Sequence, residues 1–281
     1  SKVSSLQSDV RLASLRDSVE DLDTQVSGLR PCVTDLRKRG YVFGKGMETQ
    51  ADGFANQWRS LRTRVIQEID RVTDHDAVIC TDVGQHQMWA TQWYTYTRPR
   101  QFISSGGLGT MGFGLPAAIG AKIGVPDATV IDISGDGGFQ MTMQELATAM
   151  SDDVPVVVAI LNNGYLGRVR QWQDLFWNKR YSFTCIDASD CAGCPKGSDC
   201  VRRGRQSQPD FKLLAEAFGA VGMRVTEKDE IEPALREAIA CGRPAVIDFR
   251  VSPEENVFPM VPAGQEITEM IGGTPRKRRK S

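Results

Sequence analysis

The sequence lacks the features that mark membrane proteins, exported proteins and nucleic-acid-binding proteins. No run approaches the roughly 18 uninterrupted apolar residues of a membrane helix, so we expect no membrane partner. The opening residues show neither a hydrophobic signal-peptide core nor the acid-poor composition of a transit peptide. This predicts a cytoplasmic location, or the plastid stroma in a photosynthetic eukaryote. With 34 Lys and Arg against 35 Asp and Glu, the net charge is −1, which argues against nucleic acid as a partner.

Histidine is scarce and cysteine is clustered. His75 and His86 are the only 2 histidines, which excludes a His-rich metal site. The 7 cysteines are an odd number in a long chain and favour reduced thiols over a disulfide framework. Four of them lie in a polar insertion at 185–207, at spacings of six, three and six residues: Cys185, Cys191, Cys194 and Cys200. Four thiolates suit zinc or an iron–sulfur cluster, and reduced loop thiols or disulfides are the alternative interpretation.

The pattern of apolar residues divides the chain of 281 residues into four parts. An apolar stripe with alternating three- and four-residue spacing predicts an amphipathic helical segment at 1–40, which either mediates oligomerisation or lies on its own domain. Residues 41–55 are weakly patterned and are expected to form a linker. We expect one domain at 56–272, which contains the insertion, and a basic tail at 273–281 that is either only solvated or a localisation signal.

Short apolar runs alternate with helix-length segments after residue 56. Such runs are buried on both faces when helices cross over between parallel strands. The pattern therefore predicts an α/β fold with a doubly wound, mostly parallel sheet. Ligands of these sheets bind beyond the carboxyl ends of the strands. The expected strands are 77–83, 128–134, 156–161, 245–251 and a weaker one near 220–226.

Polar residues directly follow two of the expected strands. Asp136 lies in the turn SGDGGF after one strand, and Asn162 and Asn163 follow the next. We expect a helix in the segment MTMQELATAM (141–150) between them. A right-handed crossover makes these strands neighbours, so the carboxylate and the amide oxygens are expected to meet at one edge of the sheet. Oxygen ligands of this kind suit magnesium. The sequence predicts a metal-bridged diphosphate site, with backbone amides supplied by Gly135, Gly137 and Gly138.

These residues belong to longer motifs that resemble a known family. SGDGGF followed by NN is similar to the thiamine diphosphate-binding motif of the thiamine enzymes. Four stretches, in order, resemble the catalytic large subunit of acetolactate synthase, also called acetohydroxyacid synthase. They are TDVGQHQMWATQWY (81–94), RPRQFISSGGLGTMGFGLPAAIGAK (98–122), LNNGYLGRVRQWQ (161–173) and PEENVFPMVPAG (253–264). The similarity covers roughly residues 56–271 without the insertion, which corresponds to the C-terminal cofactor-binding part of such a subunit.

The resemblance implies a transferase that decarboxylates pyruvate and joins the product to a second 2-oxoacid, in branched-chain amino acid biosynthesis. It implies thiamine diphosphate and magnesium as cofactors. The implied magnesium ligands are the side chains of Asp136 and Asn163 and the carbonyl of Tyr165. The implied cofactor-binding residues are Gln85, His86, Gly109, Met111, Gly135, Asp136, Gly137, Gly138, Asn163, Tyr165 and Leu166.

Two side chains are implied to act in catalysis. Met111 resembles the residue that props the cofactor between its two rings, and Trp172 resembles the aromatic residue that shapes the pocket for the second 2-oxoacid. Outside the motif context, Met111 would suit core filling and Trp172 a half-buried helix position. Arg168 departs from the family, which normally has Met at this place. A cation there would bind a substrate carboxylate, face solvent without a role, or reflect relaxed selection.

The chain also lacks parts that the resembling family uses. Activation of thiamine needs a glutamate from a pyrimidine-binding domain, and FAD is held largely by a middle domain, but residues 1–55 match neither. We therefore expect a partner chain that carries the pyrimidine domain, within a homo- or hetero-oligomer. FAD is expected only through a missing domain or a partner. The alternatives are another thiamine-dependent 2-oxoacid decarboxylase or oxidoreductase, and a non-catalytic binding or scaffold protein.

Overall fold

The computed structural model describes residues 61–187 and 208–272 of the chain. Gln57–Met260 form one compact unit, and residues 261–272 belong to a second one, in which a short helix, η3, spans Ile267–Glu269. The expected helical segment, linker and basic tail lie outside the described residues. Within the described ranges, no helix is long and apolar enough to cross a membrane.

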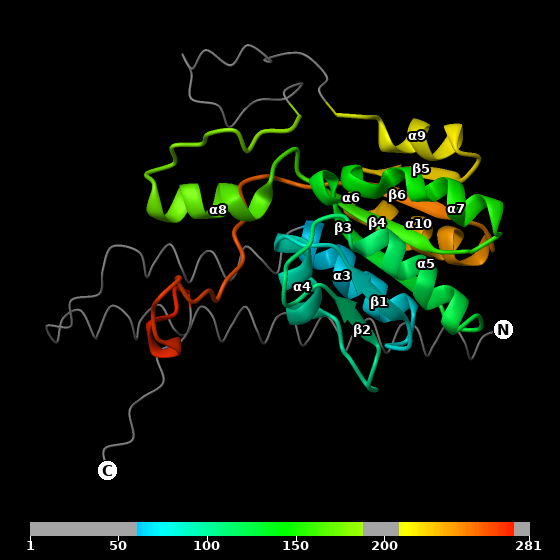
Figure 1. The fold of residues 1–281 in the computed structure, drawn as a ribbon, viewed down its shortest axis with the longest axis horizontal. Coiled ribbons are helices and arrows are strands. Elements are labelled where there is room, and N and C mark those ends of the chain that lie inside the picture. Colours follow the sequence, from blue (N-terminus) through cyan, green and yellow to red (C-terminus); the bar gives the residue numbers. More distant parts are fainter. Residues whose placement is uncertain (1–60, 188–207, 273–281) are drawn as a thin grey trace, which may run out of the picture. The chain divides into compact units, whose positions relative to one another are not determined.

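The larger unit contains a six-stranded sheet in which every pair of neighbouring strands is parallel (Figure 1). The strand order is β2-β1-β3-β4-β6-β5, so the chain runs from β1 to the edge strand β2, returns to the centre at β3 and β4, and reaches the other edge at β5 before β6 inserts between β4 and β5. This confirms the predicted fold class. The strands are β1 (Val78–Thr81), β2 (Phe102–Ser104), β3 (Val130–Gly135), β4 (Val157–Asn162), β5 (Val221–Val225) and β6 (Ala245–Arg250).

Helices bury both faces of the sheet. Val157, Ala159 and Leu161 of β4 pack with α3, α4 and α10, whereas Val158 and Ile160 pack with α5, α6, α7 and α9. Because side chains alternate along a strand, a central strand covered on both faces must be apolar throughout. The helices are α3 (Leu61–Val72), α4 (Gln85–Trp93), α5 (Gly114–Gly124), α6 (Asp136–Thr142), α7 (Leu146–Ser151), α8 (Gly167–Phe176), α9 (Phe211–Ala217) and α10 (Ile231–Ala240), with 3-10 turns η1 (Met143–Glu145) and η2 (Lys228–Glu230).

Two local details differ from the sequence prediction. The edge strand β2 was not expected, because its three residues are only half-buried and give no apolar run. The helical stretch after β3 begins at Asp136 rather than in the MTMQELATAM segment, and it is divided into α6, η1 and α7. Asp136 therefore stands at the first position of a helix, directly at the end of β3.

One acidic side chain lies inside the sheet–helix interface. Asp132 of β3 is fully buried, and its Oδ2 accepts a 2.7 Å hydrogen bond from Ser134 Oγ. Its Oδ1 contacts Gly114 of α5 so closely that a Cβ at Gly114 would overlap it. Burial is the main cause that raises the pKa of Asp132 to about 8, and the nearby charge of Asp82 adds to it.

We expect Asp132 to make the unfolding free energy depend on pH. The native pKa of about 8 exceeds the ordinary value of 3.8, so the native state keeps a proton that the unfolded chain releases. Stability should therefore fall as the pH rises between these two values. Asp132→Asn should remove up to about 1.4 kcal/mol per pH unit of this slope. Urea unfolding across the window measures it, with the exposed Asp127→Asn as control; equal slopes in all three proteins would contradict the prediction.

Candidate functional site

The polar residues after β3 and β4 meet at the carboxyl edge of the sheet. Gly135 pairs with Leu161 in the parallel register of the two strands, which brings Asp136 and the Asn162–Asn163 pair to the same edge. Asp136 Oδ2 accepts a 2.8 Å hydrogen bond from the amide of Gly164. The carboxylate thus contacts the residue directly after Asn163. The structure brings together the groups that the sequence places after these strands.

Asp136 is a buried carboxylate at the first position of α6. Its exposed fraction is 2%, and among the described residues no Lys, Arg or His forms an ion pair with it. Burial raises its pKa to about 7, with a smaller contribution from the charge of Asp248; the amide of Gly164 opposes this. A buried carboxylate without an ion-pair partner is stabilised by a bound cation, because burying an uncompensated charge is costly.

The two asparagines have different environments. Asn162 Nδ2 donates a 2.8 Å hydrogen bond to Asp248 Oδ1, and Asn162 Oδ1 accepts one of 3.0 Å from Gln208 Nε2. Asn163 Oδ1 accepts a 2.9 Å hydrogen bond from the amide of Tyr165, which leaves a second lone pair on that oxygen. Asn163 is therefore the better placed of the two to bind a cation, as the motif predicts.

Close contacts around the turn after β3 explain two of its glycines. A Cβ at Gly137 would lie 2.9 Å from Leu166 Cδ2 and 3.7 Å from Met111 Cε. A Cβ at Gly138 would overlap Asp82 Oδ2. Met111, Gly137 and Leu166 come from three separate motifs, and the structure places them around one point.

His86 and its glycine neighbours form a second part of the site. The ring is buried, and Cβ atoms at Gly84 and Gly135 would lie 2.6 and 2.8 Å from its Cε1. Burial lowers the pKa of His86 to about 4, so the ring is neutral near pH 7. Its Nε2 is buried with no hydrogen-bond partner in the described part of the chain. A buried ring nitrogen of this kind suits contact with a ligand.

Gln85 is bound to the protein rather than facing free space. Its Nε2 donates to Gln171 Oε1 at 2.8 Å and to the carbonyl of Glu255 at 3.2 Å, while Gln171 Nε2 donates to the carbonyl of Val257. These bonds join α4, α8 and the segment after β6. The acceptor Oε1 of Gln85 is buried and has no hydrogen-bond partner among the described residues. Its predicted contact with a diphosphate stays a prediction.

Asp82 is a site residue that the sequence reasoning missed. Its Oδ1 accepts hydrogen bonds from the amides of Gly112, at 2.7 Å, and Phe113, at 3.2 Å. Its other oxygen abuts Gly138. Asp82 therefore bridges the loop that carries Met111 and the turn that carries Asp136. The signal was present, because Asp82, like Asp136, directly follows a buried strand.

Two predicted residues lie at the margin of this cluster. Trp172 of α8 is 43% exposed, and the Arg168 guanidinium lies 5.5 Å from the centre of its ring. Gly109 is exposed and has a φ of 66°, in the left-handed region that favours glycine, and Val83 Cγ1 is 3.8 Å from where its Cβ would be. The structure brings neither residue into the contacts around Gly137.

Three of the four cysteines of the hypothesised metal site lie outside the described residues. The backbone of Cys185 forms an isolated antiparallel β-bridge with that of Tyr165. The Cys185 Sγ lies 3.2 Å from the carbonyl oxygen of Asp187. Cys191, Cys194 and Cys200 are not among the described residues. Among those that are, no group of three or more His, Cys, Asp or Glu could hold a metal ion. A metal in the insertion therefore stays a prediction.

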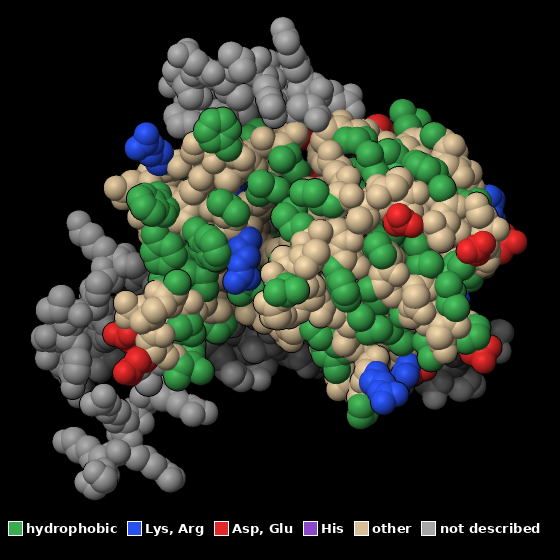
Figure 2. All heavy atoms as spheres, in the orientation of Figure 1, with side chains coloured by type: hydrophobic (Ala, Val, Ile, Leu, Met, Phe, Trp, Pro, Cys, Tyr) green, Lys and Arg blue, Asp and Glu red, His purple; other side chains and the backbone are tan. Residues whose placement is uncertain are grey.

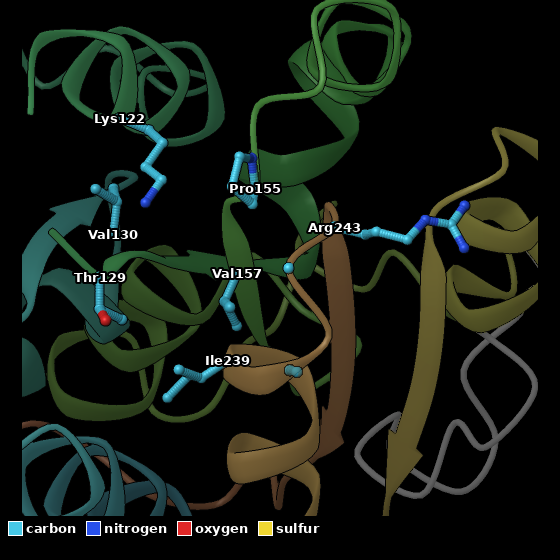
Figure 3. Close-up of a pocket in the computed structure, with 9 residues that line it drawn as sticks. Lys122, Thr129, Val130, Pro155, Val157, Ile239 and Arg243 are labelled. Atoms are coloured by element: carbon cyan, nitrogen blue, oxygen red, sulfur yellow. The ribbon is translucent and has the colours of Figure 1, made fainter. Parts of the chain in front are cut away.

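A separate pocket lies at the opposite edge of the sheet, near the amino ends of β3 and β4 (Figure 3). Its polar groups are already engaged or turned away. Lys122 Nζ donates to the carbonyls of Pro126 and Ala128. The Arg243 side chain points away from the other labelled residues, and its guanidinium donates to the carbonyl of Gly219. The carboxyl edge is the better candidate for a functional site.

Comparison with known proteins agrees with this choice. The family described as "Thiamine pyrophosphate enzyme, C-terminal TPP binding domain" matches residues 82–249, which begin at Asp82 and include the whole cluster. The match covers more than half of the chain. It includes β3, β4 and both polar segments at their carboxyl ends.

Similar proteins carry acetolactate synthase names. The "Acetolactate synthase large subunit" of Corynebacterium glutamicum is 45% identical over 92% of this chain and 38% of its own length, a longer stretch than the motifs cover. "Probable acetolactate synthase 2, chloroplastic" of Oryza sativa subsp. japonica is 42% identical over 85% of the chain and 34% of its length. "Acetolactate synthase isozyme 2 large subunit" of Escherichia coli is 45% identical over 70% and 32%.

The predicted resemblance to acetolactate synthase is confirmed by these relatives. The chain spans about a third of the length of the curated relatives it matches. The family match rests on the domain that contains the cluster of Asp136, Asn163 and Met111. The chain therefore belongs to the thiamine pyrophosphate enzymes, whose C-terminal TPP-binding domain it contains.

Proposed function

We propose that this chain is the thiamine diphosphate- and magnesium-binding component of an acetolactate synthase-type enzyme. The enzyme would decarboxylate pyruvate and join the remaining two-carbon unit to a second 2-oxoacid. The family match and the names of the relatives support this assignment. The observation that carries it is the meeting, at one sheet edge, of residues from three motifs: Asp136, Gly137, Met111, Asn163 and Leu166.

The oxygen atoms at this edge fit a magnesium ion. Asp136 offers a buried carboxylate, and Asn163 offers an amide oxygen two residues before the carbonyl of Tyr165. Carboxylate, amide and carbonyl oxygens are the ligands that magnesium prefers, with phosphate oxygens and water completing the shell. We assign these three residues as the ligands. The unpaired charge of Asp136 supports the assignment, because a divalent cation would compensate it.

The surrounding residues fit the diphosphate and the body of the cofactor. Gly137 and Gly138 stand at the start of α6, where backbone amides face an anion and the helix dipole favours it. His86 Nε2 is the buried polar atom available for the same anion. Met111 and Leu166 contribute apolar atoms beside Gly137 and would support the cofactor rings. Thiamine diphosphate, when bound, supplies the carbon nucleophile on which a 2-oxoacid loses carbon dioxide.

A partner chain completes the proposed enzyme. The family chemistry requires a glutamate from a pyrimidine domain, and the described residues of this chain match only the C-terminal TPP-binding domain. We propose a homo- or hetero-oligomer in which another chain contributes that domain. FAD would bind only through the missing middle domain or such a partner. The substrates of the complex would be 2-oxoacids, with pyruvate as the donor.

Asp136→Ala should abolish magnesium-dependent binding of thiamine diphosphate. The substitution removes the carboxylate that we assign as a metal ligand, and we expect the affinity to fall by at least about a hundredfold. Titration calorimetry of the chain with thiamine diphosphate, with and without magnesium, measures this. Asp127→Ala is the matched control, because Asp127 is exposed and lies outside the cluster. Unchanged affinity in Asp136→Ala would rule out the assigned site.

Gly138→Ala should weaken both the fold and cofactor binding. The new Cβ would overlap Asp82 Oδ2 and displace a carboxylate that holds the amides of Gly112 and Phe113. Overpacking of this kind costs about 1–3 kcal/mol of unfolding free energy. Gly120→Ala is the control, because its Cβ would meet nothing within 4 Å. Thermal unfolding and cofactor titration test both effects, and equal behaviour of the two variants would contradict the prediction.

Activity should appear only after reconstitution. We expect the chain alone to form no acetolactate from pyruvate, and a mixture with a chain that carries the pyrimidine domain to form it when thiamine diphosphate and magnesium are present. A colorimetric acetoin assay after acidification measures the product, with Asp136→Ala as the inactive control. If the chain binds the cofactor but no such partner ever yields acetolactate, the scaffold alternative is favoured.

A further inference from the structure

Arg168 is a half-buried cation on α8 that faces α4. Its Nη1 lies 2.5 Å from Met88 Sδ, and its guanidinium lies 5.5 Å from the centre of the Trp172 ring. Hydrophobic side chains gather around a Lys or Arg group in the region of α4 and α8 (Figure 2). The guanidinium is therefore held between a thioether and an aromatic ring, both of which are neutral.

This cation differs from other arginines near the carboxyl edge because it has no counter-ion among the residues that the structure describes. Arg170 pairs with Glu254 at 2.7 Å, and Arg224 pairs with Asp248 at 3.1 Å. In the described part of the chain, no carboxylate lies within ion-pair distance of Arg168. Burial alone lowers the pKa of Arg168, with no acidic neighbour to raise it. A half-buried guanidinium with no counter-ion among the described residues would be stabilised by an anion from outside them.

The contact between α4 and α8 connects Arg168 to the proposed cofactor site. Gln85 and Met88 lie about one turn apart on α4, and they contact Gln171 and Arg168 of α8, respectively. The residue before Arg168 is Gly167, whose Cβ would lie 2.7 Å from Asn163 Nδ2. Arg168 therefore lies beside the residues of the proposed cofactor site, where α4 and α8 are in contact.

We propose that Arg168 selects an acceptor 2-oxoacid that carries a second carboxylate at the end of its side chain. The proposal rests on the function proposed above and specifies the class of its second substrate. Met88 and the Trp172 ring suit the methylene groups of such an acceptor, and the guanidinium binds the terminal carboxylate. A monocarboxylic acceptor would place a neutral side chain beside the cation and leave the cation unpaired.

The reaction with this acceptor needs no further reagent. The bond between the carbonyl carbon and the carboxylate of pyruvate breaks, and carbon dioxide leaves. A new carbon–carbon bond forms between the remaining two-carbon unit and the 2-oxo carbon of the acceptor, whose carbonyl oxygen takes up a proton. The terminal carboxylate of the acceptor does not react. It serves only for recognition by Arg168.

The test compares two probe acids on the full chain saturated with thiamine diphosphate and magnesium. Titration calorimetry measures the affinities for 2-oxoglutarate, which has two carboxylates, and for 2-oxobutyrate, which has one. We expect 2-oxoglutarate to bind roughly tenfold or more tightly, the size of one charge-assisted hydrogen-bonded contact. Arg168→Met should abolish the preference and leave cofactor affinity unchanged. Arg168→Lys should retain part of it, and Arg236→Met, at an exposed site on α10, should retain all of it.

The outcomes separate this proposal from the proposed function. The acid titrations are repeated without cofactor, so a chain that fails to bind thiamine diphosphate still reports on Arg168. Equal affinity for the two acids in both conditions, or a preference that survives Arg168→Met, overturns the proposal. If Arg168→Met instead weakens association with the pyrimidine-domain chain and leaves acid binding unchanged, Arg168 is an interface residue and the proposal is wrong. Loss of cofactor binding alone contradicts the proposed function.

Discussion

The parallel pairing of β3 and β4 is the constraint on which the site depends. Parallel neighbours end at the same edge, so residues that follow the two strands meet although a helical crossover separates them in the sequence. Helices on both faces bury the strands completely and fix their register. The carboxyl edge is therefore rigid. Asp136 and the turn at Asn163 lie within one residue of the strand ends, so the strands fix their positions.

Two sets of polar contacts stabilise this edge from opposite sides. Asp82, at the end of β1, binds the loop that precedes α5 and abuts the turn after β3. Asp248 of β6 accepts hydrogen bonds from Asn162 and from the arginines of β5 and β6. The hydrogen bonds of Asp82 hold the loop that carries Met111, and those of Asp248 include the side chain of Asn162. Buried carboxylates thus perform different tasks here: Asp82 and Asp248 hold neighbouring segments together, whereas Asp136 accepts a bond from the Gly164 amide and forms no ion pair with a cationic side chain of the described residues.

The sequence predicted most of the architecture because a doubly covered parallel sheet has a strong signal: apolar strands alternating with helices. The sequence did not predict β2, because its three half-buried residues give no such run. The predicted helix after β3 began too late in the sequence. Gly137 and Gly138 disfavour a helix by propensity, but the helix α6 begins directly at the end of the strand and includes both. The cluster of Asp136 and Asn163 followed from topology. The hydrogen bonds of Gln85 and Asp82 did not, because bonds across distant segments have no local sequence pattern.

Helix α8 has a special place in this arrangement. The helix lies to one side of the sheet (Figure 1) and is joined to the rest of the unit through side-chain bonds such as Gln85–Gln171 and Arg170–Glu254, and its Trp172 is partly exposed. A substitution on the outer side of α8 therefore changes side chains that lie away from β3 and β4 and leaves the sheet edge intact. Under the proposed function, cofactor and acceptor are bound by separate elements, so a single change on this helix can alter which acceptor is bound without altering the chemistry at the edge.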